Sequence, residues 1–97
     1  MNNDIVNEFL TESREHLETV EEELLKLEQD SRDSKTINEL FRAIHSIKGG
    51  AGFFGFTSIS QLAHDMENLL YKARSGDLLL ENRHIHVLFA GLDRLKE

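Results

Sequence analysis

The first third of the chain carries apolar residues at alternating spacings of three and four positions. The stripe consists of Val6, Leu10, Leu17, Val20, Leu24 and Leu27, with Ser13 as its one polar member. Such spacing aligns these residues along one side of an α-helix, as in a helix bundle or a coiled coil. The pattern predicts an amphipathic helix over residues 4–29. Its other side is strongly acidic, and we interpret that side as a solvated surface.

Three further amphipathic stripes follow, separated by short segments rich in polar residues and glycine. They predict helices over residues 35–53, 57–75 and 82–97, with Gly55 and Gly76 available to end the second and third helices. Four amphipathic helices with short connections are typical of an all-α fold, an antiparallel up-down four-helix bundle.

The whole chain, residues 1–97, has the length of a single domain with a modest core. The apolar stripe of the last helix is still running at Glu97, where the sequence gives no helix stop signal. We therefore expect that the chain was excised from a longer protein; the alternative is a natural terminus at which the helix frays.

Composition excludes several classes of function. The chain has no cysteine, so it forms neither a disulfide framework nor a thiolate metal site. A net charge of −7 argues against a nucleic-acid partner, because binding to phosphates needs clustered Lys and Arg. No apolar run has the length of a membrane span, and the N-terminus lacks the features of a signal peptide. We expect a cytoplasmic protein without membrane insertion.

One segment of the second helix departs from the ordinary pattern, because it combines His45 with three glycines. At about 100° per residue, His45 lies on the shoulder between the apolar side and water, next to Phe41, Lys48, Gly49 and Gly52. A glycine inside a helix costs about 1 kcal/mol relative to alanine, so three of them require an explanation. We interpret Gly49 and Gly52 as bare backbone that gives a partner access to the imidazole. We interpret Gly50, on the other flank, as a site of close helix packing.

Glu67 occupies the matching flank of the third helix, about 100° from its apolar line. Consecutive helices joined by a short turn are antiparallel, so their like flanks meet. We therefore expect His45 and Glu67 to face each other at the rim of one groove. His64 precedes Glu67 by one turn and is expected to lie further out.

The segment HSIKGGAGFFGF, residues 45–56, resembles the phosphorylated-histidine motif of histidine phosphotransfer (HPt) domains. The similarity runs from EFLTESREHLETVEEELLKLE to LAHDMENLLYKARSG and is greatest to the N-terminal domains of the CheA-type chemotaxis sensor histidine kinases. It implies a phosphorelay carrier of a two-component system. In that role His45 takes the γ-phosphoryl group of ATP from the catalytic domain of the kinase. It then passes the group to an aspartate of a response-regulator receiver domain. Lys48, Glu67 and His64 map onto residues near the phosphorylated ring.

A histidine that accepts a phosphoryl group must offer a neutral nitrogen with its lone pair outward. A carboxylate on the other nitrogen fixes that tautomer, so we assign Glu67 to Nδ1 and leave Nε2 to attack. Lys48, three residues after His45, is placed to offset the phosphoryl charge, and His64 is a secondary candidate. We expect a receiver domain to dock at the groove around His45, Gly49 and Gly52.

The chain lacks a nucleotide-binding loop and a carboxylate cluster for Mg²⁺. We therefore expect a monomeric carrier that binds no cofactor and is not self-sufficient in catalysis, with ATP and Mg²⁺ supplied through the partner kinase domain. The sequence leaves open whether the domain is part of a chemotaxis kinase, a free-standing phosphotransfer protein or part of a hybrid kinase. It also leaves open whether the output is chemotaxis, pilus control or another response, and which response regulator accepts the group.

Two other interpretations stay open. The first is a metal site made from His45, His64 and Glu67, although the paired Glu-x-x-His motifs of metal-binding bundles are missing. The second is a structural or protein-docking bundle, in which replacing His45 leaves function intact. The remaining histidines, interpreted as surface or packing residues, are His16, His84 and His86.

Overall fold

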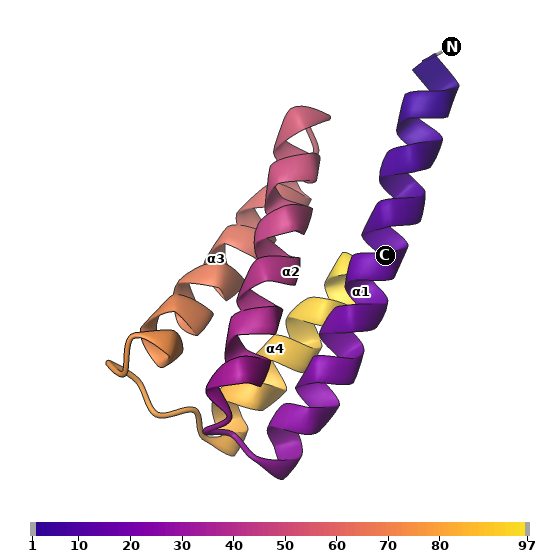
Figure 1. Cartoon of the computed structure of the whole chain (residues 1–97). Coiled ribbons are helices and arrows are strands. Elements are labelled where there is room, and N and C mark those ends of the chain that lie inside the picture. The colour runs from indigo at the N-terminus through magenta and orange to yellow at the C-terminus, as the bar shows by residue number, and fades with distance from the viewer. Residues whose placement is uncertain (1, 97) are drawn as a thin grey trace.

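The computed structural model describes the backbone of residues 2–96 and the side chains of residues 4–96. In this range the chain forms four helices, shown in Figure 1: α1 (Asn2–Gln29), α2 (Ser34–Phe53), α3 (Thr57–Arg74) and α4 (Asn82–Leu95). This arrangement confirms the all-α four-helix bundle that the hydrophobic pattern predicts. None of the helices in the described range is long and apolar enough to cross a membrane.

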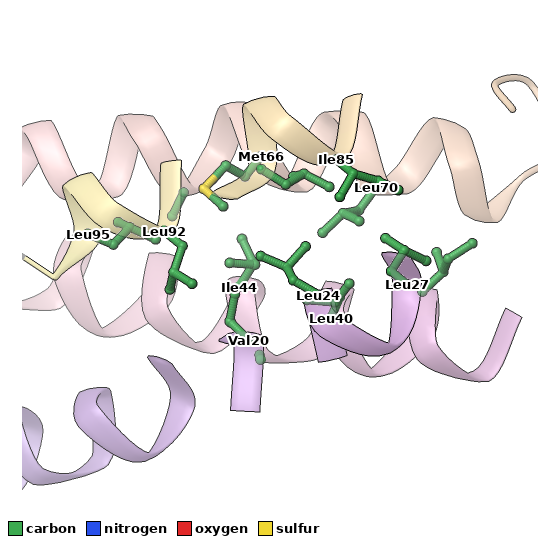
Figure 2. Close-up of a cluster of buried hydrophobic side chains, with 14 of the residues drawn as sticks. Val20, Leu24, Leu27, Leu40, Ile44, Met66, Leu70, Ile85, Leu92 and Leu95 are labelled. Carbon is green, nitrogen blue, oxygen red and sulfur yellow. The ribbon is translucent and has the colours of Figure 1, made fainter. Parts of the chain in front are cut away.

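The core lies between the helices and consists mainly of aliphatic side chains (Figure 2). Its fully buried members include Val20, Leu24, Leu27, Leu40, Ile44, Leu70, Ile85, Leu88 and Leu92. Burying a side chain of this size stabilises a fold by about 1.5–3 kcal/mol. α2 packs against both α1 and α3, and α4 packs against the same two helices. The core therefore fixes the side of α2 that faces inward, and with it the rim between α2 and α3.

Only the second half of α1 belongs to this core. Leu17 is half-buried and Val20 is fully buried, whereas Ile5 and Leu10 are 54% and 44% exposed. α1 has 28 residues but α4 only 14, and the N-terminal part of α1 extends past the other helices (Figure 1). The predicted apolar stripe is therefore a packed seam from Leu17 onward, but the prediction is wrong at Leu10.

The connections hold neighbouring helices antiparallel. Asp33 begins α2: its Oδ1 accepts hydrogen bonds from the backbone N–H groups of Lys35 and Thr36. Its Oδ2 accepts one from the Thr36 hydroxyl at 3.0 Å, and these bonds, the hydroxyl's above all, lower the pKa of Asp33. Gly55 and Gly76 adopt positive φ angles of 77° and 85°, a region that glycine enters without strain. They turn the chain after α2 and after α3.

Candidate functional site

His45 lies at the rim of the bundle where α2 meets α3. Ile44 and Ile47 on either side of it are buried in the core and fix the orientation of the helix. Because successive residues are about 100° apart, the side chain of His45 is carried out to the shoulder of α2. That side chain is 62% exposed. A reagent in solution or on a partner protein can therefore reach the ring.

Glu67 on α3 meets this histidine across the contact between the two helices. Its Oε2 lies 2.5 Å from His45 Nδ1, although 22 residues separate the two positions in sequence. Only 10% of the Glu67 side chain is exposed. The structure thus brings together the histidine and the carboxylate that helical phase placed on facing flanks.

The contact with Glu67 decides the chemistry of the imidazole. An ionised carboxylate only accepts hydrogen bonds, so Nδ1 of His45 is the donor. In a neutral ring the second nitrogen, Nε2, then carries the lone pair. His45 therefore presents a nucleophilic nitrogen on the edge of the ring away from Glu67.

Lys48 also binds Glu67. Its Nζ lies 2.6 Å from Oε1, so each oxygen of the carboxylate has its own partner. Burial raises the pKa of Glu67, but the hydrogen bonds and charges of Lys48 and His45 outweigh burial and leave that pKa lowered. Glu67 is consequently ionised at neutral pH, as the hydrogen bond to Nδ1 requires.

His64 stands beside this network without a hydrogen bond to it. Its Nδ1 lies 4.0 Å from Glu67 Oε1, beyond hydrogen-bond length. Its Nε2 lies 3.4 Å from the side-chain nitrogen of Asn68, at the long end of the range. The side chain is 48% exposed and borders the same groove as Lys48.

A groove of about 470 Å³ opens between α2 and α3 next to the network. It is lined by Lys48, Gly49, Gly52, Gly55, Thr57, Ser60, Gln61 and His64. A Cβ added at Gly49 would have no other atom within 4 Å, and one at Gly52 would meet only Ser60 Oγ, at 3.7 Å. Bare backbone therefore continues from His45 along the groove.

Gly50 serves a different purpose from the two glycines beside it. A Cβ at this position would lie 2.6 Å from the ring of Phe9 on α1. The same ring packs against Phe54 and Phe56, with centroids 4.7 Å and 5.8 Å away. The prediction that Gly50 permits close packing is confirmed, whereas Phe53 is 80% exposed and does not join the packed interior.

Phe41 lies on the apolar side of α2 and one turn before His45, as the hydrophobic pattern predicts, and its ring lies next to the imidazole. The two rings are nearly parallel, with an angle of 9° between their planes and centroids 6.2 Å apart. The available signal was their spacing of four residues, which puts both side chains on the same stretch of helix surface. The pattern shows that spacing but not how the rings are turned.

The other predicted features lie apart from this site. Nδ1 of His84 accepts a hydrogen bond from the backbone N–H of Glu81 at the start of α4. His16 borders a shallow hollow between α1 and α2 together with Glu39 and Arg42.

Among the described residues, no group of three His, Cys, Asp or Glu side chains is arranged to hold a metal ion. The metal interpretation therefore gains no support from the geometry.

Known proteins are similar to this chain in both sequence and fold. The family profile described as "Hpt domain" matches residues 4–97. The chemotaxis protein CheA of Bacillus subtilis is 38% identical over 94 residues, and that of Salmonella typhimurium is 43% identical over 94 residues. Each alignment covers 97% of this chain but only 14% of the relative. The chain thus spans a small part of the curated relatives that it matches.

Two solved structures have the same arrangement of helices. The CheA phosphotransferase domain from Thermotoga maritima matches with a TM-score of 0.90 at 38% identity, covering 95% of this chain and 88% of that domain. The solution structure of the histidine phosphotransfer domain of CheA matches with a TM-score of 0.93 at 38% identity, covering 99% and 72%. Both are similar in sequence and fold over nearly the whole chain.

Proposed function

Because the chain belongs to the Hpt domain family, we propose that it is the phosphotransfer domain of a chemotaxis signalling kinase. His45 accepts the γ-phosphoryl group of ATP from the catalytic domain of the kinase and passes it to an aspartate of a response-regulator receiver domain. The observation that carries this proposal is the 2.5 Å contact between Nδ1 and the buried carboxylate of Glu67. It leaves Nε2 on an exposed ring as the free nucleophile.

The transfer runs in two steps at one nitrogen. Nε2 of His45 attacks the γ-phosphorus, an N–P bond forms, and the bond from that phosphorus to the bridging oxygen breaks as ADP leaves with the electron pair. The proton on Nδ1 stays in its hydrogen bond, so Glu67 stabilises the positive charge that develops on the ring. In the second step the aspartate oxygen attacks the phosphorus, and the lone pair returns to Nε2.

Lys48 and His64 are assigned to the phosphoryl oxygens. The ammonium group of Lys48 has three N–H donors, and the contact with Glu67 uses one of them. Its remaining donors offset the charge of a phosphoryl group on the neighbouring ring. His64 lines the same groove as Lys48 and has a secondary role there.

The catalytic machinery belongs to the partners. ATP and Mg²⁺ are held by the kinase domain, and this chain acts in the cytoplasm, where ATP is available, as a monomeric carrier. We assign the docking of kinase and receiver domains to the surface around His45, Gly49 and Gly52. A partner can approach closely here, because the two glycines present only backbone.

The test is phosphorylation of the 97-residue chain by the catalytic portion of a CheA kinase with radiolabelled Mg-ATP. Wild type should acquire acid-labile, base-stable label, and His45→Gln should acquire none. His84→Gln is the matched control, because it removes another helix-surface imidazole while leaving the contact between His45 and Glu67 in place.

Label that persists in His45→Gln would mean that another residue accepts the phosphoryl group. If folded wild type stays unlabelled while the kinase phosphorylates its own substrate domain, the phosphotransfer function is wrong.

A further inference from the structure

The hydrogen bond to Glu67 secures one edge of an imidazole that is otherwise largely in solvent. The His45 side chain is 62% exposed, so few packing contacts limit its tilt. A hydrogen bond tolerates deviations of tens of degrees. When the imidazole tilts about this hydrogen bond, its far nitrogen, Nε2, moves most. In-line transfer, by contrast, requires reacting atoms about 3–3.5 Å apart and aligned.

Phe41 supplies the missing restraint. It precedes His45 by one helical turn, and side chains on a helix lean toward the N-terminus, so the imidazole lies next to the phenyl ring. The angle of 9° between the ring planes and the centroid separation of 6.2 Å describe an offset parallel stack. The stack limits tilting of the ring plane, whereas Glu67 selects which nitrogen faces inward.

The phenyl ring is itself held in place from α3. The guanidinium carbon of Arg74 lies 4.1 Å from the centroid of Phe41, a cation–π contact. Tyr71 adds a tilted aromatic contact at 6.5 Å. Arg74 reaches Asn38, one turn before Phe41, whereas His45 lies one turn after it. The cation and the imidazole therefore approach Phe41 from opposite directions along α2.

We propose that Phe41, held by Arg74, is a positioning residue that fixes the plane of the His45 ring for phosphoryl transfer. This inference rests on the proposed function, because it assumes that Nε2 of His45 is the nucleophile. α3 then orients the nucleophile twice, through Glu67 at the ring edge and through Arg74 behind Phe41.

The test compares Phe41→Leu, Phe41→Tyr and Phe89→Leu in phosphorylation by the catalytic portion of a CheA kinase with Mg-ATP. Phe41→Leu should lower kcat by about 3- to 10-fold, because the loss of one aromatic stacking contact changes a rate by about that factor. KM for the chain should stay unchanged. Phe41→Tyr should restore kcat, since it keeps the planar face. Phe89→Leu makes the same substitution at another half-buried position, on α4, and should not change kcat.

A second measurement separates the plane of the ring from its tautomer. In ¹⁵N spectra of the ring nitrogens, the proton should remain on Nδ1 of His45 in Phe41→Leu, because Glu67 is untouched. If Phe41→Leu is too unstable to assay, Arg74→Met decides instead. Arg74 is exposed, and its replacement should lower kcat about twofold without changing Tm.

Several results would overturn the inference: an unchanged kcat in the deciding variant, a failure of Phe41→Tyr to restore kcat, a loss of equal size in Phe89→Leu, or a shift of the His45 proton to Nε2. Unlabelled wild type would instead contradict the proposed function itself, so the two failures are distinguishable.

Discussion

His45 and His84 use the same ring atom in opposite ways. Nδ1 of His45 donates a hydrogen bond to the Glu67 carboxylate on a neighbouring helix. Nδ1 of His84 accepts one, at 2.9 Å, from the backbone N–H of Glu81 at the start of its own helix. The proton therefore sits on Nδ1 in His45 and on Nε2 in His84. Of these two rings, His45 is the one with a lone pair on Nε2.

The difference shows that the partner of a histidine, more than its exposure, decides what the ring can do. The bond at His84 is local and satisfies a backbone group at a helix end, a structural task. The bond at His45 requires two helices to pack in a fixed register. The hydrogen bond that orients the His45 ring is consequently a property of the tertiary fold.

Replacing the carboxylate should give the largest change. Glu67→Gln keeps a hydrogen-bond acceptor for Nδ1 but removes the negative charge, and should slow phosphorylation of His45 by about 10- to 100-fold. Glu81→Gln, the matched change beside His84, should leave the rate unchanged. Initial rates with a CheA catalytic portion and Mg-ATP measure both. Equal rates for Glu67→Gln and wild type would remove the distinction between the two histidines.

Blocking the bare backbone beside His45 should have the next largest effect. Beyond its own turn of helix backbone, a Cβ at Gly49 would have no atom within 4 Å, so Gly49→Leu should fold and even gain stability. It should slow transfer from phosphorylated His45 to a receiver domain by about tenfold, because even a small misplacement of the reacting groups lowers the rate. Val87→Leu, near His84 on exposed α4 surface, is the control. Undiminished transfer in Gly49→Leu would show that access along the groove is unimportant.

The charge of Glu67 should appear in the pH dependence of stability. Its pKa is lowered in the folded state from an ordinary value of 4.5. A group of this kind contributes its stability above the unfolded pKa and loses it as the pH falls through the folded pKa. The free energy of unfolding of wild type should therefore exceed that of Glu67→Gln most above about pH 4.5 and converge on it in acid. Denaturant titrations from pH 7 to pH 3 measure the difference, and a gap that widens in acid would contradict the assignment.

The smallest change should come from His84. His84→Ala leaves the N–H of Glu81 without its side-chain acceptor and should cost about 0.5–1.5 kcal/mol of stability. Phosphorylation of the chain should stay at the wild-type rate. Urea unfolding and the labelling assay together check this, and a lower labelling rate at unchanged stability would give His84 a part in the chemistry.

Helical periodicity is sufficient to predict the bundle and to place His45 and Glu67 on facing flanks of two neighbouring helices. Both depend on angular position around a helix, which the sequence specifies at about 100° per residue. The same reasoning separated Gly50, which packs against Phe9, from the open positions Gly49 and Gly52.

Helical periodicity does not specify the axial register between helices or the length over which a helix is packed. The contact of Lys48 with Glu67 depends on how far α2 is shifted along α3, which no local pattern records. Leu10 belongs to the apolar stripe yet is 44% exposed, because the other helices do not enclose its section of α1. The stacking of Phe41 on His45 depends on side-chain rotamers set by α3. The role of Lys48 toward the phosphoryl group stays a prediction.

The most direct test of the central claim is to find which nitrogen carries the phosphorus. The chain, labelled with ¹⁵N in its histidines and phosphorylated by a CheA catalytic portion, can be examined for ¹⁵N–³¹P coupling. We predict coupling at Nε2 of His45, with the proton retained on Nδ1. Coupling at Nδ1 of His45, or at a nitrogen of His64 or His84, would contradict the account of how Glu67 orients the ring.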